Sequence, residues 1–249
     1  MHPFVTMVEM RLGMVWRTLL DMVYPRTCAG CGKLAAPELG HFCWDCQSNV
    51  LYVRSPYCSI CGDPVEGRVD GSFVCYACSE SAPFFDRARS AVRYRGVMRN
   101  ILQEFKYREG FWMRPDLVRL LVACVATHYD REEIDAVTFV PLYPTRYRQR
   151  GYNQAEVLAG LLAKSIRKPL LKYCLARFKP TQTQTHLTVR DRVINVKGAF
   201  KTRWLSRLKG RRILLVDDVM TTGATVNECS RVLKAGGAAR VVVVTVARG

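Results

Sequence analysis

The stretch ILLVDDVMTTGAT, residues 213–225, combines residue types that could bind a ligand. Four apolar residues lead directly into Asp217 and Asp218, and a turn of hydroxyl-bearing and small residues follows. An apolar run of this kind predicts a strand that is covered on both faces of a parallel sheet. Ligands of such sheets bind beyond the carboxyl ends of the strands, which is where the two acids would lie. Two charges at that position are costly unless a bound group uses them.

The turn after the two acids predicts a site for an anion. It consists of Thr221, Thr222, Gly223, Ala224 and Thr225. It leads into an expected helix, whose first amides and dipole favour negative charge, and the hydroxyls add hydrogen-bond donors. The carboxylates suit the hydroxyls of a sugar, or magnesium through water, so the whole stretch predicts a phosphorylated sugar as ligand. For any single residue, an ordinary turn and helix start is the alternative.

Eight of the eleven cysteines form four CxxC pairs. They are Cys28 and Cys31, Cys43 and Cys46, Cys58 and Cys61, and Cys75 and Cys78. Two such pairs supply the four thiolates of a tetrahedral zinc site, so we predict two structural zinc ions. Sequential pairing is favoured and interleaved pairing is the alternative, with His41 a further candidate ligand. A disulfide framework is disfavoured because no secretion signal is evident and three cysteines would be left over.

Those three, Cys124, Cys174 and Cys229, have apolar neighbours. We interpret them as buried, unreactive thiols.

The composition is that of a folded protein with a strongly basic surface. The 249 residues are 49% apolar and carry a net charge of +17, and no apolar run approaches the roughly 20 residues of a membrane span. Residues 1–24 are apolar but interrupted by charges, which favours an amphipathic helix that docks on the body over a signal peptide; a membrane-surface helix is the alternative.

The basic residues are concentrated in one part of the chain. Residues 146–212 contain 18 Lys and Arg but only Glu156 and Asp191 as acids. This excess suits phosphates, diphosphates or a nucleic-acid backbone as partners. Aromatic residues that would permit base stacking lie among the cations: Tyr143, Tyr147, Tyr152, Phe178 and Trp204.

From about residue 84, strands and helices are predicted to alternate. The expected strands are 86–96, 136–141, 171–176, 211–218 and 239–247, and the expected helices begin at Val97 and cover 116–129, 153–166 and 223–235. This alternation predicts an α/β fold with a mainly parallel, doubly wound sheet. A polar loop is expected after 136–141, and residues 177–200 are predicted to form a long mobile loop.

Four stretches carry a resemblance to a known family. VDDVMTTGAT resembles the phosphoribosyl-pyrophosphate (PRPP) signature of type I phosphoribosyltransferases. FKYREG (105–110), RQRGYNQAEVLA (148–159) and TQTQTHLTVRDRVINVKGAF (181–200) narrow the likeness to the ComF family, which includes competence protein ComFC and GntX-type proteins. That family joins a double zinc ribbon to a transferase-like domain. The resemblance therefore implies a double zinc ribbon at 25–83 and a phosphoribosyltransferase-like domain at 84–249, which would follow the amphipathic helix expected at 1–24.

The resemblance also implies roles for individual residues. Asp217 and Asp218 would be the catalytic acids, which hold the ribose hydroxyls and magnesium-bound PRPP. Residues 221–225 would cradle the 5′-phosphate. Arg150, in a stretch with Arg146, Arg148, Asn153 and Gln154, matches the pyrophosphate-binding region, and Lys106 is a candidate for the same task. Arg190 and Arg192 lie at the position of the flexible catalytic loop.

Two classes of function follow from the resemblance. One is a cytoplasmic protein of natural transformation that binds PRPP with magnesium and handles incoming single-stranded DNA. The other is an active phosphoribosyltransferase with an unidentified acceptor and no DNA role. A zinc ribbon that docks a helicase partner is compatible with either. Turnover is the feature that separates the two classes.

Overall fold

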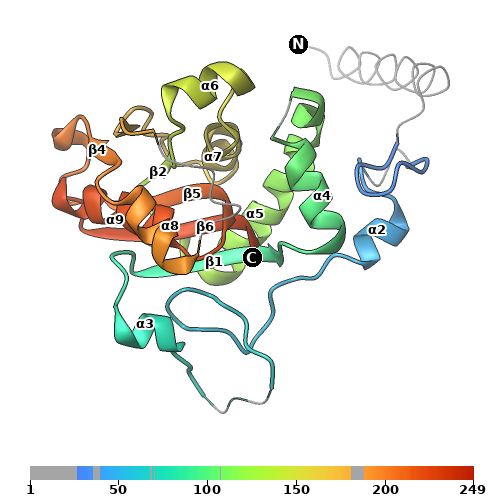
Figure 1. Cartoon of the computed structure of the whole chain (residues 1–249), viewed down its shortest axis with the longest axis horizontal. Helices are drawn as coiled ribbons and strands as arrows, with labels where there is room; N and C mark the ends of the chain where they lie inside the picture. Colours follow the sequence, from blue (N-terminus) through green and yellow to red (C-terminus); the bar gives the residue numbers. More distant parts are fainter. Residues whose placement is uncertain (1–26, 36–39, 68, 70, 107, 181–187) are drawn as a thin grey trace, which may run out of the picture. The chain divides into compact units, whose positions relative to one another are not determined.

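The computed structural model describes residues 27–35, 40–67, 69, 71–106, 108–180 and 188–249. They form two compact units, the first ending at Asn49 and the second running from Val50 to Gly249 (Figure 1). The helix predicted for 1–24 lies outside the described residues. The predicted boundary between a zinc ribbon at 25–83 and a transferase-like domain at 84–249 stays a prediction.

A four-stranded parallel sheet forms the centre of the second unit (Figure 1). Its order is β1 (Arg87–Arg93), β6 (Arg240–Arg248), β5 (Arg212–Met220) and β2 (Ala136–Phe139). All neighbouring strands are parallel, and an isolated parallel bridge from Leu170 to Val137 continues the sheet beyond β2. The predicted parallel sheet is confirmed, and its apolar strands are buried as such a sheet requires.

Helices cover both faces of this sheet, as the doubly wound prediction requires. The helices of the described chain are α2 (Trp44–Ser48), α3 (Tyr76–Glu80), α4 (Gly96–Glu104), α5 (Arg114–His128), α6 (Pro144–Arg150), α7 (Gln154–Ser165), α8 (Val189–Val196) and α9 (Ala224–Ala235), with short 3-10 turns at Arg108–Met113, Arg131–Glu133 and Leu205–Arg207. Helices α5 and α7 contact each other and lie along the strands. Helix α9 packs on β5 and β6, and α8 packs on α9.

Side-chain alternation along β5 shows which groups share the α9 face. Ile213 and Leu215 belong to one buried cluster with Cys229 of α9 and with Cys58 and Cys61. Successive strand residues point to opposite faces, so the second cysteine group packs on the same face of the sheet as α9. Cys124, Cys174 and Cys229 are buried as predicted, and burial raises the pKa of each thiol.

Two predictions of loop structure were wrong. Residues 144–150, expected to lie in a polar loop, form α6, which begins with Pro144 at its first turn and ends at Gly151 with φ +78°. The stretch 177–200 contains α8, where the Thr188 side chain accepts a hydrogen bond from the Asp191 amide. Helix α6 has capping residues but no apolar periodicity, and the apolar positions of α8 extend over only eight residues, so periodicity, which was the signal used, did not mark either helix.

The strand predicted at 171–176 is also shifted. It is β3 (Leu175–Arg177), and it pairs antiparallel with β4 (Phe200–Thr202) in a separate two-stranded ribbon. The ribbon is built from residues on either side of the stretch 178–199. Within the part of the chain that the structure describes, no helix has the length and apolar character needed to cross a membrane.

Candidate functional site

The site lies where the chain reverses direction across the sheet. From β2 the chain crosses through α7 to Leu170 at the outer edge, whereas from β5 it crosses through α9 to β6 on the other side. Strands β2 and β5 are neighbours, so their carboxyl ends border the crevice of a topological switch point. Asp217 and Asp218 are the residues of β5 that follow its buried apolar run.

The two carboxylates turn back on the backbone of the strand that carries them. Asp217 Oδ1 accepts a hydrogen bond from the Asp218 amide at 2.9 Å, and Asp218 Oδ1 accepts one from the Val219 amide at 2.8 Å. Burial raises the pKa of Asp217 well above its ordinary value, and the negative charge of Asp218 raises this pKa further. The pair would therefore be stabilised by a cation or by hydrogen-bond donors.

The predicted phosphate loop surrounds a small hollow beside Asp217. The hollow is lined by Asp217, by residues 219–221 and by residues 223–226. Gly223 precedes α9 with φ +79°, a backbone conformation in which any other residue would be strained, so the turn favours glycine. Thr222 Oγ1 accepts a long hydrogen bond, 3.4 Å, from the Ala224 amide. Of the five predicted loop residues, Thr221, Gly223, Ala224 and Thr225 line the hollow, and Ala224 and Thr225 are the first two residues of α9.

Lys106 and Arg150, the two predicted pyrophosphate contacts, are linked through one buried glutamine. Arg150 Nη1 donates to Gln154 Oε1 at 3.1 Å, and Gln154 Nε2 donates to the Lys106 carbonyl at 3.0 Å. The charge of Lys106 acts on Asp217, where it lowers the pKa. The structure thus brings the stretch 105–110 and the stretch 148–159 together at the edge that carries the acids.

Other residues of these two motifs hold the backbone in place. Tyr152 is buried and its hydroxyl donates to the Phe105 carbonyl. Asn153 is also buried, accepts from the Ala155 amide as the cap of α7, and donates to the Val140 carbonyl just after β2. A Cβ on Gly110 would lie 2.5 Å from the Glu104 backbone. Tyr152, Asn153 and Gln154 are therefore positioning residues, and Tyr152 is not an exposed stacking surface.

One charged residue near the acids was missed by sequence reasoning. Arg177 of β3 is partly buried, which lowers its pKa, and its guanidinium lies 5.3 Å from the centre of the Phe200 ring. The charge of Asp217 raises the pKa of Arg177, so the two groups lie within electrostatic reach. No local motif marks Arg177, because its position depends on the pairing of β3 with β4.

The eight CxxC cysteines form two groups with sequential pairing, as favoured. One group is Cys28, Cys31, Cys43 and Cys46, and the other is Cys58, Cys61, Cys75 and Cys78. The sulfurs of each group lie within 4.8 Å of one another, and the Cys31–Cys43 and Cys61–Cys75 sulfur pairs are each 3.6 Å apart. Four thiolates around one zinc ion would be about 3.8 Å apart. The side chains therefore fit one zinc ion in each group, and His41 is not a member of either group.

Backbone amides prepare the first cysteine of each group for metal binding. Cys28 Sγ accepts from the Gly30 and Cys43 amides, and Cys58 Sγ accepts from the Cys75 amide. Burial raises the pKa of both thiols, but the amide hydrogen bonds outweigh burial and lower the pKa to about 7 in each case. These donors stabilise the thiolate, which is the form that binds zinc.

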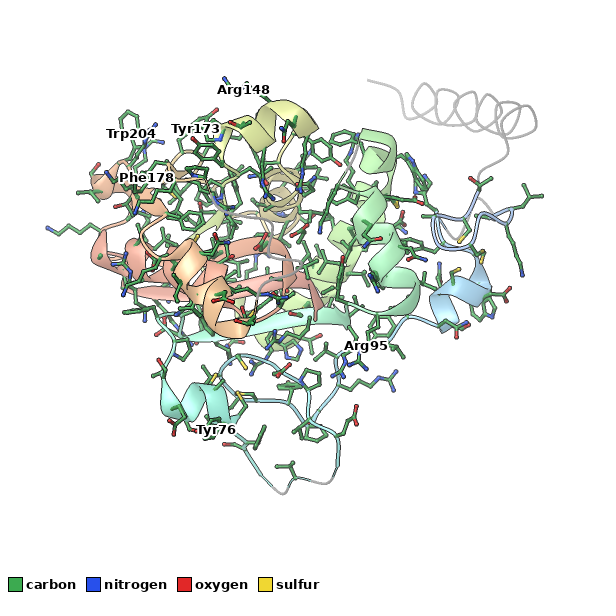
Figure 2. The ribbon with its side chains drawn as sticks, viewed as in Figure 1. Tyr76, Arg95, Arg148, Tyr173, Phe178 and Trp204 are labelled. Carbon is green, nitrogen blue, oxygen red and sulfur yellow. The ribbon has the colours of Figure 1, made fainter. Side chains whose placement is uncertain are left out.

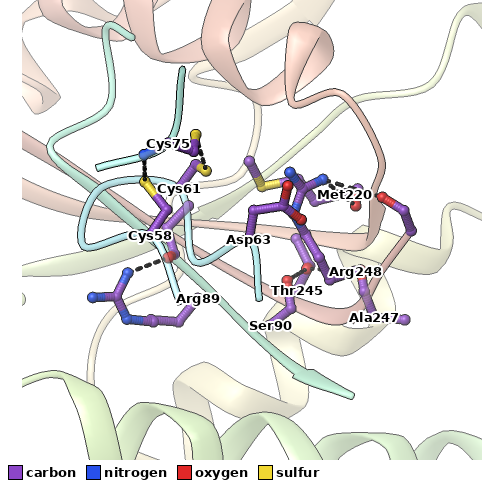
Figure 3. Close-up of polar contacts among 12 residues, drawn as sticks. Cys58, Cys61, Asp63, Cys75, Arg89, Ser90, Met220, Thr245, Ala247 and Arg248 are labelled. Atoms are coloured by element: carbon purple, nitrogen blue, oxygen red, sulfur yellow. Dashed lines mark hydrogen bonds and ion pairs between the residues drawn. The ribbon is translucent and has the colours of Figure 1, made fainter. Parts of the chain in front are cut away.

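The second cysteine group is joined to the phosphate loop by one arginine (Figure 3). Arg248, at the end of β6, has its Nε 3.2 Å from a carboxylate oxygen of Asp63, two residues after Cys61. Arg248 Nη1 donates to the Met220 carbonyl at 3.1 Å, and the Gly249 amide donates to the same oxygen. Arg248 therefore connects the backbone at the start of the loop to Asp63, next to the second cysteine group.

Comparison with known proteins agrees with both parts of the chain. The double zinc ribbon domain matches residues 19–79, and the phosphoribosyl transferase domain matches residues 153–249. Competence protein F of Haemophilus influenzae is 33% identical over 226 residues, which cover 89% of this chain and 96% of that protein. The chain belongs to the competence protein F (ComF) family.

Further relatives carry two different names. DNA utilization protein YhgH of Escherichia coli K12 is 30% identical over 80% of this chain and 93% of its own length. Competence protein ComFC of Bacillus subtilis is 24% identical over 79% of each chain. Among solved structures, the B. subtilis glutamine PRPP amidotransferase has a TM-score of 0.39 at 19% identity, over 57% of this chain and 30% of that chain. Family membership rests on the relative from Haemophilus influenzae, and the phosphoribosyltransferase fold rests on the matched domain together with the parallel sheet.

Proposed function

We propose that this chain binds PRPP with magnesium at the carboxyl edge of β5 and takes part in natural transformation, where it handles incoming single-stranded DNA in the cytoplasm. The observation that carries the ligand assignment is the pair Asp217 and Asp218 beside the hollow of residues 219–226, at the switch point of the sheet. The competence role is supported by relatives named competence protein F and ComFC.

The chemistry of the site fits the parts of PRPP. The glycine turn before α9 and the first amides of the helix favour a phosphate. The carboxylates of Asp217 and Asp218 can accept hydrogen bonds from ribose hydroxyls or bind hydrated magnesium. Magnesium would neutralise charge on the diphosphate, and Lys106 and Arg150 are placed to add positive charge at the same edge.

The test is calorimetric titration of the zinc-loaded protein with PRPP and magnesium. The Asp217→Asn, Asp218→Asn double variant should lose PRPP binding by at least tenfold, while binding of single-stranded DNA stays within about twofold. Loss of both would contradict separate sites, and full retention of PRPP binding would overturn the assignment of the loop. Release of pyrophosphate with a candidate acceptor would make the chain an active transferase, whereas binding without release would favour PRPP as a regulator of DNA handling.

The single variant Asp217→Asn has an expected effect on stability. The pKa of Asp217 is higher in the folded chain than in the unfolded chain, so ionisation above the unfolded value, near 4, destabilises the empty folded protein. Asn at this position removes that cost. At pH 7 and without ligand, Asp217→Asn should melt at the same temperature as the parent or higher, which separates loss of binding from loss of fold.

A further inference from the structure

The β3–β4 ribbon carries exposed aromatic rings at both of its ends. The register pairs Leu175 with Thr202 and Arg177 with Phe200. The ribbon is extended by hydrogen bonds from the Arg203 amide to the Cys174 carbonyl and from the Phe178 amide to the Ala199 carbonyl. Tyr173 and Trp204 therefore flank one end and Phe178 flanks the other. Figure 2 shows the three labelled side chains gathered around β4.

Tyr173 and Trp204 are held in a backbone conformation that large side chains avoid. Their φ angles are +64° and +59°, and within the described chain Arg167 is the only other non-glycine residue with positive φ. This conformation costs about 1–2 kcal/mol for each residue. Yet 67% of Tyr173 and 61% of Trp204 is exposed, so the strain does not serve to bury either ring. Strain that presents a ring to solvent is a feature of binding sites.

Cations accompany these rings, and acids are almost absent from this part of the chain. Lys201 Nζ lies 4.4 Å from the centre of the Phe178 ring, and the Arg207 guanidinium lies 5.7 Å from that of Trp204. Residues 157–216 contain 15 Lys and Arg, and their one acid is Asp191. A surface of this composition attracts a polyanion, and its rings offer faces on which other rings can stack.

We propose that the surface at and beside this ribbon, formed by Tyr173, Phe178, Lys201, Trp204 and, from the 3-10 turn that follows, Arg207, binds single-stranded nucleic acid by stacking bases on the rings and pairing phosphates with the cations. Duplex DNA buries the faces of its bases, so it cannot use the rings in this way, and single strands are the polyanion that uses both features. This inference deepens the single-stranded DNA handling of the proposed function and rests on it.

The length of the ribbon sets the size of the site. From the Cys174–Arg203 pair to the Phe178–Ala199 pair the strand advances four residues, or about 13 Å at 3.3 Å per residue. A stacked single strand advances about 3.4 Å per nucleotide, so the ribbon spans about four nucleotides. Arg177 of the same ribbon lies within electrostatic reach of Asp217. The proposed surface does not include Asp217 or Asp218, so its binding of nucleic acid can be tested separately from PRPP binding.

The test is fluorescence anisotropy of a labelled 20-nucleotide oligothymidylate with the full zinc-loaded chain. The variant is Tyr173→Asn with Trp204→Asn, because Asn adopts the left-handed conformation more readily than an aromatic residue and should preserve the fold. The matched control is Tyr76→Asn, since Tyr76 is 78% exposed but lies in α3. We expect at least tenfold weaker binding for the ribbon variant, unchanged binding for the control and unchanged PRPP titration for both.

Three results would overturn the inference, and they differ in whether they also contradict the proposed function. If the parent chain binds oligothymidylate and the ribbon variant binds it equally well, this surface is rejected as the binding site, and the proposed function still stands. Equal competition by duplex DNA would reject base stacking as the mechanism. Absence of binding by the parent chain would reject the surface together with the DNA-handling part of the proposed function, while the PRPP titration would still stand or fall separately.

Discussion

The two four-cysteine groups are made from the same parts but stand in different settings. In each, a glycine follows the first CxxC pair with φ near +70°, and a short helix contains the last cysteine: Gly32 and α2 in the first group, Gly62 and α3 in the second. The first group belongs to the unit that ends at Asn49. The second belongs to the unit that contains the sheet, and Cys58, Cys61 and Cys78 are part of its main core.

The surroundings of the second group explain the difference. The Ala88 amide of β1 donates to the Ile60 carbonyl, and Arg89 Nη2 donates to the Ser59 carbonyl. Asp63 forms an ion pair with Arg248, which in turn holds the Met220 carbonyl before the phosphate loop. The same motif therefore belongs to a separate unit in its first copy and to the unit that contains the sheet in its second copy, and the spacing of the cysteines alone does not reveal this.

Removing one zinc ligand from each group should give the largest difference between the two groups in their effect on the stability of the sheet unit. Cys31→Ser and Cys61→Ser occupy equivalent positions, and each should lower the zinc content from two ions to one. We expect Cys61→Ser to reduce the free energy of unfolding of the sheet unit by at least about 5 kcal/mol, because metal binding and folding are coupled there. Cys31→Ser should leave that transition unchanged. Urea unfolding followed by circular dichroism measures this, and equal destabilisation would contradict the distinction.

Gly32 and Gly62, which occupy equivalent positions in the two cysteine groups, provide a second test of this difference, with a smaller expected effect. Alanine at either position must adopt the left-handed conformation, at a cost of about 1–2 kcal/mol. A Cβ on Gly62 would also lie 2.7 Å from the Ala88 carbonyl oxygen, whereas one on Gly32 has no described heavy atom within 4 Å. Crowding of this kind costs about 1–3 kcal/mol more. Gly62→Ala should therefore lower the melting temperature of the sheet unit by about 4–20 °C.

Gly32→Ala should not move the melting transition of the sheet unit, and its cost should appear as weaker retention of the first zinc ion against a chelator. If both alanine variants lower the melting temperature equally, the packing of Gly62 against β1 does not contribute as the distances indicate.

Sequence reasoning predicted those features whose signal is local. The run Ile213–Val216 followed by two acids predicted the candidate site at the end of β5, and the spacing of the CxxC pairs predicted both cysteine groups. Features that depend on distant pairing were missed, such as Arg177 near Asp217 through the β3–β4 ribbon, and Asp63 against Arg248. Helix α6 was missed for a different reason: its seven polar residues lack an apolar face, although Pro144 and Gly151 mark its two ends.

The smallest expected effect concerns an ion pair in each unit. Arg248 is only 8% exposed beside Asp63, whereas Lys33 and Asp45 of the first unit are 72% and 71% exposed at 3.6 Å. Asp63→Asn removes the carboxylate that pairs with the buried Arg248 guanidinium. It should lower the free energy of unfolding by only about 1 kcal/mol, because Asp63 itself is half exposed and water screens the pair. Asp45→Asn should change nothing measurable.

Because Arg248 also holds the backbone of the predicted phosphate loop, Asp63→Asn should weaken PRPP binding by about two- to threefold. High salt screens the ion pair, so the difference in PRPP binding between the variant and the parent should become smaller at high salt. Calorimetry on both variants measures this. An Asp63→Asn chain that binds PRPP as the parent does would show that Met220 holds the loop without help from the cysteine group, and the two groups would then differ in stability but not in function.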